Sequence, residues 1–318
     1  MRGDEQVDFV EITPELRAAV DRGLVYLAEH QSEKGSYGGD RYGDHVGITA
    51  LACMAFMADG SLPGRGRYGD HVQRGLDFVL ASTNEAGLIA ADTSHGPMYG
   101  HGFATLFLGE VYGMTDDPEV RRVLLKAVRL IVNTQNHEGG WRYQPVPYDA
   151  DISVTICQIM ALRSARNAGL SVPRATIDRA IAYVRNCQNP ADGGFRYMVR
   201  SGESAFARSA AGVAALYYSG VYEDDAVDRG LDYLSRPGLG SINRGQPHYH
   251  YGHYYCSQTM FLAGGQHWAS YFPEIRTELI ERQNDDGSWE SNHGRDYGTA
   301  MSLLVLQIPN RLLPIFQR

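Results

Sequence analysis

The sequence predicts an all-α protein, an (α/α)6 barrel built from six helical hairpins. Three observations predict it: one pattern recurs along the chain, each copy holds two apolar helical stretches, and a glycine-rich loop joins them. Copies of about 50 residues, six in all, account for the whole chain. We therefore expect residues 1–318 to form one domain.

The first helix of most copies begins with a basic residue and carries apolar residues at helical spacing. A sixth copy, EIRTELIERQ, begins at Glu274 without the base. The charges on these helices predict an outer ring that faces solvent. The other five copies start at RGLVYLAEHQ (Arg22), RGLDFVLAST (Arg74), KAVRLIVNTQ (Lys126), RAIAYVRNCQ (Arg179) and RGLDYLSRPG (Arg229).

The second helix of each copy is apolar and rich in small residues, as in VGITALACMAF and FARSAAGVAAL. Small side chains allow helices to approach closely around a crowded centre. An open stack of hairpins needs polar capping repeats, and neither end of this chain carries an obvious one. We therefore expect the hairpins to close into six inner and six outer helices.

The loop inside each hairpin combines Gln, a glycine turn and an aromatic residue. It reads QSEKGSY, QNHEGGW, QNPADGGF and QNDDGSW in copies one, three, four and six. We expect the Gln to bond backbone groups at the helix end, the Gly to adopt positive φ and the aromatic to pack on a neighbouring hairpin. These residues are expected to be structural.

The loops resemble the QW motifs of squalene-hopene and oxidosqualene cyclases, and a similar repeat occurs in protein prenyltransferase β subunits. The resemblance covers nearly the whole chain, with degenerate loops in copies two (STNEAGL) and five (SRPGLGS). It implies an α/α toroid whose inner helices surround a cavity. Function does not follow from it, because such folds host unrelated chemistries.

The segment GGWRYQPVPYDADISVT resembles the acidic motif that opens an inner helix in class II terpene cyclases. In that family the middle aspartic acid protonates an alkene or an epoxide. The resemblance implies that Asp151 is the general acid and Asp149 its orienting partner, although Ile152 replaces the motif's third Asp. An Asp just before an apolar helix is also a common N-cap, and that alternative stays open.

A second candidate cluster, PHYHYGHYYCSQ, opens the fifth inner helix. Histidines at this spacing could ligate zinc together with Asp296. Gly298, however, stands where the prenyltransferase zinc site has a His, so we expect no metal and no cofactor. We expect instead a mouth that recognises a polar group of a ligand, with simple packing of the rim as the alternative.

The starts of the other inner helices carry further polar and aromatic residues, and all are expected to face the same mouth. Converging polar groups in a concave site are the default prediction for ligand binding. Aromatic faces there would also stabilise a carbocation. The candidate ligand-binding residues are His45, His101, Tyr148, Arg208, His250, His253, Tyr254, Asp296 and Tyr297.

Composition excludes several classes of protein. A net charge of −8 argues against a duplex nucleic-acid binder or a polybasic membrane anchor. No stretch approaches the ~18 apolar residues of a membrane span, and the N-terminus lacks the pattern of a signal peptide. The four scattered cysteines are expected to be buried free thiols. We expect a soluble chain, cytoplasmic unless a signal peptide was removed, and leave peripheral membrane contact open.

Two functions follow from these patterns. The first is a terpene-cyclase-like enzyme that acts on a hydrophobic isoprenoid by proton-initiated cyclisation. The second is a non-catalytic toroid that binds a hydrophobic ligand or a partner protein. A prenyltransferase-like or carbohydrate-active α/α barrel is a further alternative, since carboxylates could also serve in glycoside hydrolysis: Asp149, Asp151, Glu203 and Asp296.

Overall fold

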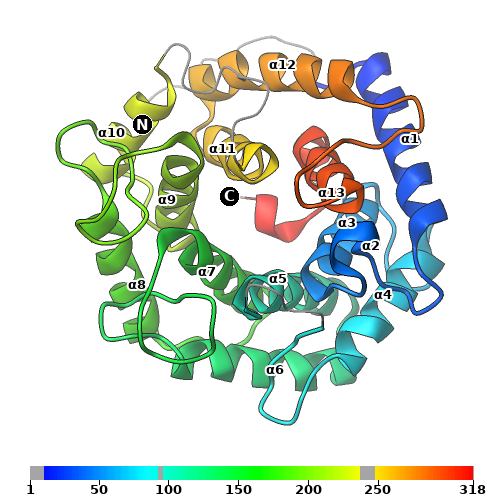
Figure 1. Cartoon of the computed structure of the whole chain (residues 1–318), viewed down its shortest axis with the longest axis horizontal. Helices are drawn as coiled ribbons and strands as arrows, with labels where there is room; N and C mark the ends of the chain where they lie inside the picture. The colour runs from blue at the N-terminus through cyan, green and yellow to red at the C-terminus, as the bar shows by residue number, and fades with distance from the viewer. Residues whose placement is uncertain (1–10, 92–95, 237–247, 318) are drawn as a thin grey trace.

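The helices form two concentric rings in the computed structural model, which describes residues 11–91, 96–236 and 248–317 (Figure 1). The outer ring of this part of the chain consists of α1 (Pro14–His30), α4 (Gly69–Ala81), α6 (Pro118–Asn133), α8 (Arg174–Cys187), α10 (Asp225–Leu234) and α12 (Gly265–Arg282). The inner ring consists of α3 (Val46–Ala58), α5 (Met98–Thr115), α7 (Ile152–Asn167), α9 (Phe206–Tyr218), α11 (Tyr249–Ala263) and α13 (Arg295–Leu306). A single turn, α2 (Gly39–Tyr42), precedes α3. The predicted all-α barrel of helical hairpins is confirmed.

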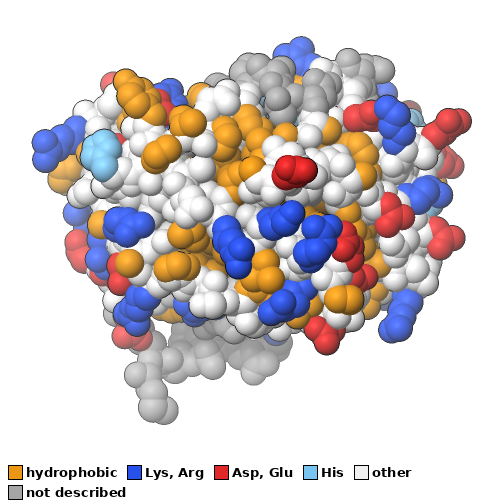
Figure 2. Space-filling view, turned by 90° about the horizontal axis from the view of Figure 1, so that it is seen from below, with side chains coloured by type: hydrophobic (Ala, Val, Ile, Leu, Met, Phe, Trp, Pro, Cys, Tyr) orange, Lys and Arg blue, Asp and Glu red, His pale blue; other side chains and the backbone are white. Residues whose placement is uncertain are grey.

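The two rings differ in how their helices are buried. Every residue of α3 is buried, because this inner helix has neighbours on all sides. Helix α6 buries only a stripe that includes Val120, Leu124 and Ile131, spaced as one face of a helix requires. Its other face meets solvent, and Figure 2 shows acidic and basic side chains interspersed over one side of the molecule.

Small residues let the inner helices approach closely. A Cβ atom added to Gly47 on α3 would lie 2.9 Å from the Cα of Gly100 on α5, so neither position has room for a larger side chain. The ring closes where α13 packs against both α1 and α3. Among the helices of the described ranges, none combines the length and apolar character needed to cross a bilayer.

Each Gln of the hairpin loops joins its loop to the next outer helix. The Nε2 of Gln135 donates to the carbonyls of Gly139 and Thr176, both at 2.9 Å, and Arg179 donates to its Oε1. Gln31 and Gln283 repeat the arrangement with Arg74 and Arg22. At these three junctions the basic residue that begins the first helix is therefore the partner of the preceding copy's Gln, whereas Arg229 donates instead to the Asn189 and Pro190 carbonyls.

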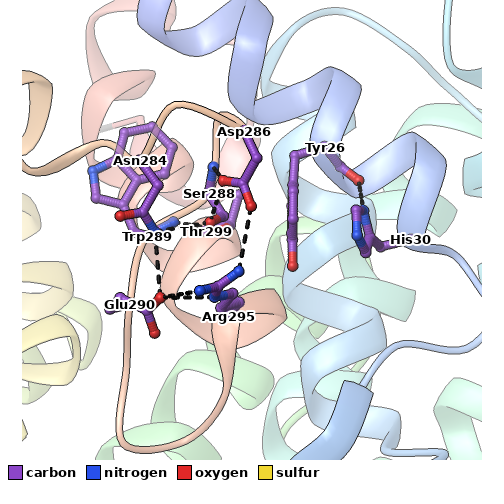
Figure 3. Close-up of polar contacts among 9 residues, drawn as sticks. All are labelled: Tyr26, His30, Asn284, Asp286, Ser288, Trp289, Glu290, Arg295 and Thr299. Atoms are coloured by element: carbon purple, nitrogen blue, oxygen red, sulfur yellow. Dashed lines mark hydrogen bonds and ion pairs between the residues drawn. The ribbon is translucent and has the colours of Figure 1, made fainter.

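The aromatic residue of each loop closes the same junction from inside. The indole of Trp141 donates to the Ile131 carbonyl at 2.7 Å, and its backbone N–H donates to Thr155 Oγ1 at 3.1 Å. Trp289 makes the equivalent contacts with Leu279 and Thr299, and Figure 3 shows Thr299 beside Trp289. Arg295, which follows that sixth loop, also forms ion pairs with Asp286 and Glu290, at 3.4 and 2.6 Å (Figure 3).

Glycine is required in these loops by two constraints together. Gly139 has φ +100°, a region that L residues rarely adopt. A Cβ atom there would also lie 2.2 Å from the Arg179 carbonyl oxygen. The loop can therefore contact the next outer helix only if this position lacks a side chain.

A C-terminal segment enters the ring, as Figure 1 shows near its centre. It contains two 3-10 turns, η1 (Ile308–Asn310) and η2 (Pro314–Phe316), and buries Leu313, Ile315 and Phe316. Gln307 and Asn310 donate to carbonyls of Ala55 and Ala58 in the last turn of α3, at 3.0 and 2.9 Å. We call residues 307–317 the C-terminal plug, because they occupy the end of the barrel where the inner helices finish.

Candidate functional site

Asp151 begins α7 and caps it. Its Oδ1 accepts a 2.8 Å hydrogen bond from the Val154 N–H, which satisfies one of the unpaired donors at the helix start. Its own N–H donates to the Trp141 carbonyl at 3.0 Å, so the loop aromatic and the acid are held together. Capping of α7 therefore accounts for one of the two carboxyl oxygens of Asp151, Oδ1.

The other oxygen of Asp151 lies in a polar cluster. Tyr197 donates its hydroxyl to Oδ2 at 3.2 Å, and the Nε of Arg142 lies 3.6 Å from the same atom. The side chain is 0% exposed, and burial raises the pKa of Asp151 to about 6 against the opposing effects of Val154, Tyr197 and Arg142. The carboxyl can therefore carry a proton at a mildly acidic pH.

Arg142 organises this cluster, which we call the Arg142 cluster: Arg142, Tyr143, Asp149, Asp151 and Tyr197. Its guanidinium pairs with Asp149 as well as Asp151 and lies over the rings of Tyr143 and Tyr197, 5.2 and 5.9 Å from their centroids. The two tyrosine hydroxyls are hydrogen-bonded to each other. Arg142 therefore links Asp149 to Asp151.

Sequence reasoning gave no role to Arg142 or Tyr197, although a signal for them exists. The third copy reads GGWRY and the fourth reads GGFRY, so Tyr143 and Tyr197 hold equivalent places in adjacent repeats. Because adjacent hairpins lie side by side in the ring, equivalent residues of two copies can meet. Comparing the copies position by position could have paired these two tyrosines.

Side chains of α11 cross the interior to α7. The Tyr251 hydroxyl donates to the Ser153 carbonyl at 3.0 Å, and the Tyr255 hydroxyl lies 3.3 Å from Cys157 Sγ. Tyr255 is fully buried, and the ring of Tyr254 packs beside it with centroids 4.9 Å apart. At this level the space between α7 and α11 is occupied by aromatic rings.

Several predicted site residues make structural contacts. His45 caps α3 by accepting from the N–H groups of Gly47 and Ile48. His101 is buried, accepts from the Ile89 N–H at 3.2 Å, and takes the place that Thr155 holds in the third copy. Burial lowers the pKa of His101 to about 4, so its ring is neutral.

Other predicted residues lie apart from the Arg142 cluster. Arg208 donates to the Glu203 carbonyl at 2.8 Å, and Asp296 accepts from the Gly38 N–H at 3.0 Å. His253 is buried, with Nδ1 2.7 Å from the Tyr271 hydroxyl. The side chain of Tyr148 is 81% exposed, on the loop before α7.

His250 and Tyr297 meet in a pocket of about 230 Å³, which we call the rim pocket. It is bounded by residues 248–251 at the start of α11, Arg282 at the end of α12, residues 290–293 of the next loop, and Tyr297 on α13. Sequence reasoning missed Arg282 and the loop residues, because they lie outside the inner-helix starts. In the described chain, no group of three or more His, Cys, Asp or Glu residues is arranged to hold a metal ion.

Solved structures share this fold at low sequence identity. An α-1,6-mannanase from Salegentibacter, an inactive variant in complex with α-1,6-mannotriose, has a TM-score of 0.72 at 9% identity, over 93% of this chain and 99% of that chain. The type II terpene cyclase MstE from Scytonema, in complex with geranylgeranyl dihydroxybenzoate, has a TM-score of 0.65 at 14% identity, over 94% and 98%. No family model and no curated protein sequence matches the chain. The chain is therefore an α/α toroid similar in fold to both a terpene cyclase and a mannanase.

Proposed function

We propose that the protein is a terpene-cyclase-like enzyme in which Asp151 is the general acid for an isoprenoid substrate. The observation that carries the proposal is the state of the Asp151 carboxyl, which is buried and has a pKa of about 6. A carboxyl in this state is protonated at a mildly acidic pH and can then give its proton to a substrate. Asp149 acts on it through Arg142, which contacts both aspartates.

The acid strength favours an epoxide over an isolated alkene. Protonating a carbon–carbon double bond requires a much stronger acid than a carboxyl with a pKa of about 6. An epoxide oxygen is more basic: it takes the proton, its C–O bond breaks, and a neighbouring alkene forms the new C–C bond. The cation then loses a proton to form the product alkene, so the conversion is an isomerisation that needs no oxidant.

Tyr197 is the route by which the proton leaves Asp151. The carboxyl is closed off from solvent, whereas Tyr197 and Tyr143 are half-buried. Their hydroxyls continue the hydrogen bond from Asp151 Oδ2 to these partly exposed side chains. Tyr99 at the start of α5, whose ring centroid lies 6.1 Å from that of Tyr143, offers a further aromatic ring to a developing carbocation.

Ligand binding without catalysis is the second candidate function. It is favoured by the complete burial of Asp151 and by the tyrosines of α11 that occupy the interior beside α7. In that case the only role of the Asp151 carboxyl is to stabilise α7 and the Arg142 cluster. The two candidates differ in whether the carboxyl is needed for turnover.

A product screen separates them. Purified protein is incubated with squalene, oxidosqualene, farnesyl diphosphate and geranylgeranyl diphosphate, and products are identified by gas chromatography–mass spectrometry. We expect a cyclised product from oxidosqualene, lost in Asp151→Asn and strongly reduced in Tyr197→Phe. Asp117→Asn is the matched control, because Asp117 caps the outer helix α6. Absence of any product would favour the binding toroid, and an active Asp151→Asn would remove Asp151 from the mechanism.

A further inference from the structure

The rim pocket is distinct from the Arg142 cluster and holds polar groups that have no partner. No hydrogen bond joins the imidazole of His250 or the hydroxyl of Tyr297 to the described part of the chain. Both side chains are half-buried and line the pocket. Polar groups that line a pocket and have no protein partner can form hydrogen bonds to a ligand bound there.

The charged residues of the rim pocket are already neutralised. Arg282 pairs with Glu278 at 2.6 Å and lies over the Tyr249 ring, 4.6 Å from its centroid. Glu290 pairs with Arg295 at 2.6 Å. Burial and the nearby Arg282 lower the pKa of His250 to about 4, so its ring is neutral at physiological pH. An anionic ligand would find no cation here that lacks a carboxylate partner.

The remaining lining groups suit hydroxyl groups. Neutral imidazole, phenol, amide and alcohol side chains each offer a donor, an acceptor or both, as sugar hydroxyls do. Ser291 and Asn292 supply the alcohol and the amide. Tyr297 stands edge-on to His293 and His250, with ring centroids 5.3 and 6.4 Å apart, so aromatic surface lines the same space. Aromatic rings can pack against the C–H faces of a sugar ring.

The volume of the rim pocket limits the size of the ligand that it can hold. The volume of about 230 Å³ lies below the roughly 300–1,000 Å³ of pockets that hold drug-sized molecules. A single six-membered ring with hydroxyl substituents is of the right scale, whereas a polyisoprenoid chain is not. We propose that the rim pocket is a binding site for a neutral, polyhydroxylated ring of monosaccharide size, with His250 and Tyr297 as its principal polar contacts.

Binding is tested with defined probes by saturation-transfer difference NMR and by calorimetry. The neutral probes are glucose, mannose, galactose and myo-inositol; glucose 6-phosphate and Zn²⁺ represent an anion and a metal. We expect at least one neutral probe to bind and the phosphate to bind no better than its parent sugar. Failure of all four neutral probes, or preference for the phosphate or for Zn²⁺, would overturn the proposal.

Variants locate the site. His250→Leu and Tyr297→Phe should each raise Kd about tenfold, the effect of losing one hydrogen bond in a partly buried site. His137→Leu is the matched control, because His137 is exposed on the loop after α6. Far-UV circular dichroism establishes that each variant is folded. Equal affinity of the wild type and both pocket variants would place any sugar binding elsewhere.

The proposal does not depend on the function proposed for Asp151. No residue of the Arg142 cluster lines the rim pocket, although the lining residue Tyr251 reaches the acid's helix through its hydrogen bond to the Ser153 carbonyl. Asp151→Asn should therefore leave sugar binding unchanged while abolishing cyclisation. Sugar binding without cyclisation, or cyclisation without sugar binding, identifies which of the two proposals has failed.

Discussion

At the residue scale, one carboxylate combines two tasks. Oδ1 of Asp151 caps α7, and Oδ2 faces Tyr197 and Arg142. The cap holds the carboxyl in one orientation, so that Oδ2 is the atom available for a proton. An N-cap and an acid are therefore compatible roles for this residue.

Two substitutions of Asp151 separate capping from ionisation. Asparagine retains a cap acceptor, so at pH 4, where the Asp151 carboxyl is protonated, the melting temperature of Asp151→Asn should stay close to that of the wild type. Alanine removes the acceptor, and Asp151→Ala should lose about 1 kcal/mol of stability. Thermal unfolding followed by circular dichroism measures both. Equal melting temperatures for the two variants would show that the cap contributes little.

The same residue predicts a pH dependence of stability. The pKa of Asp151 is about 6 in the folded chain, above the ordinary Asp value of 3.8, so the folded state binds the proton more tightly. This contribution is fully present below pH 3.8 and is lost as the pH rises through 6. Asp151→Asn should remove that component of the stability profile, which denaturant titrations between pH 4 and 7 would measure.

Sequence reasoning placed Asp149 and Asp151 correctly at the start of an inner helix but could not rank the histidines. His101 stands where other copies have Thr or Ser, and its imidazole replaces their hydroxyl as acceptor for a loop N–H. A histidine chosen for one backbone contact looks the same in sequence as one that binds a ligand. Contacts between copies, such as His250 beside Tyr297, depend on how adjacent hairpins pack.

At the element scale, the hairpin loops join neighbouring copies. The Gly, the aromatic and the Gln were expected to be structural, and the structure shows the contacts that each makes. The role of the leading bases was not foreseen, because Arg179 and Gln135 lie 44 residues apart and meet only when adjacent hairpins pack. The repeat pattern predicted the elements; the bonds between them required the ring geometry.

Ring closure can be tested at one of these junctions. Gln283 bonds the Ala19 carbonyl of α1 at 2.8 Å, so it joins the last copy to the first. Gln283→Ala and Gln135→Ala should each cost about 1–3 kcal/mol, because each leaves buried groups without partners. Gln266→Ala, on the exposed side of α12, is the control. Chemical denaturation gives the values, and an unchanged stability of Gln283→Ala would contradict a closing role.

At the scale of the whole molecule, the C-terminal plug is held by a buried acid. Glu110 on α5 accepts from the Ile315 N–H at 2.9 Å and from Ser164 Oγ at 2.6 Å. Burial raises the pKa of Glu110 to about 7. Burial also raises the pKa of the nearby Tyr218 and Tyr254 phenols, and the charge of Glu110 raises it further. The plug has no counterpart in the repeat, which is why the repeat pattern did not predict its position.

The plug should loosen as the pH rises. Withdrawal of residues 307–317 would let water reach Glu110 and lower its pKa, so ionisation favours the open state at a pH above about 7. Hydrogen exchange of the Ile315 amide should therefore accelerate above that pH beyond the normal base catalysis. Glu110→Gln should abolish the extra acceleration, whereas Glu29→Gln, at an exposed position, should not. Identical pH profiles of Ile315 exchange for the wild type and Glu110→Gln would contradict this prediction.

The plug also restricts access to the barrel. Leu313, Ile315 and Phe316 are buried at the end where the inner helices finish, so a molecule cannot pass through the ring at that end. If Asp151 acts on a substrate as proposed, substrate and product would both use the end where the inner helices begin. Product that has not left would then exclude the next substrate, so we expect competitive product inhibition.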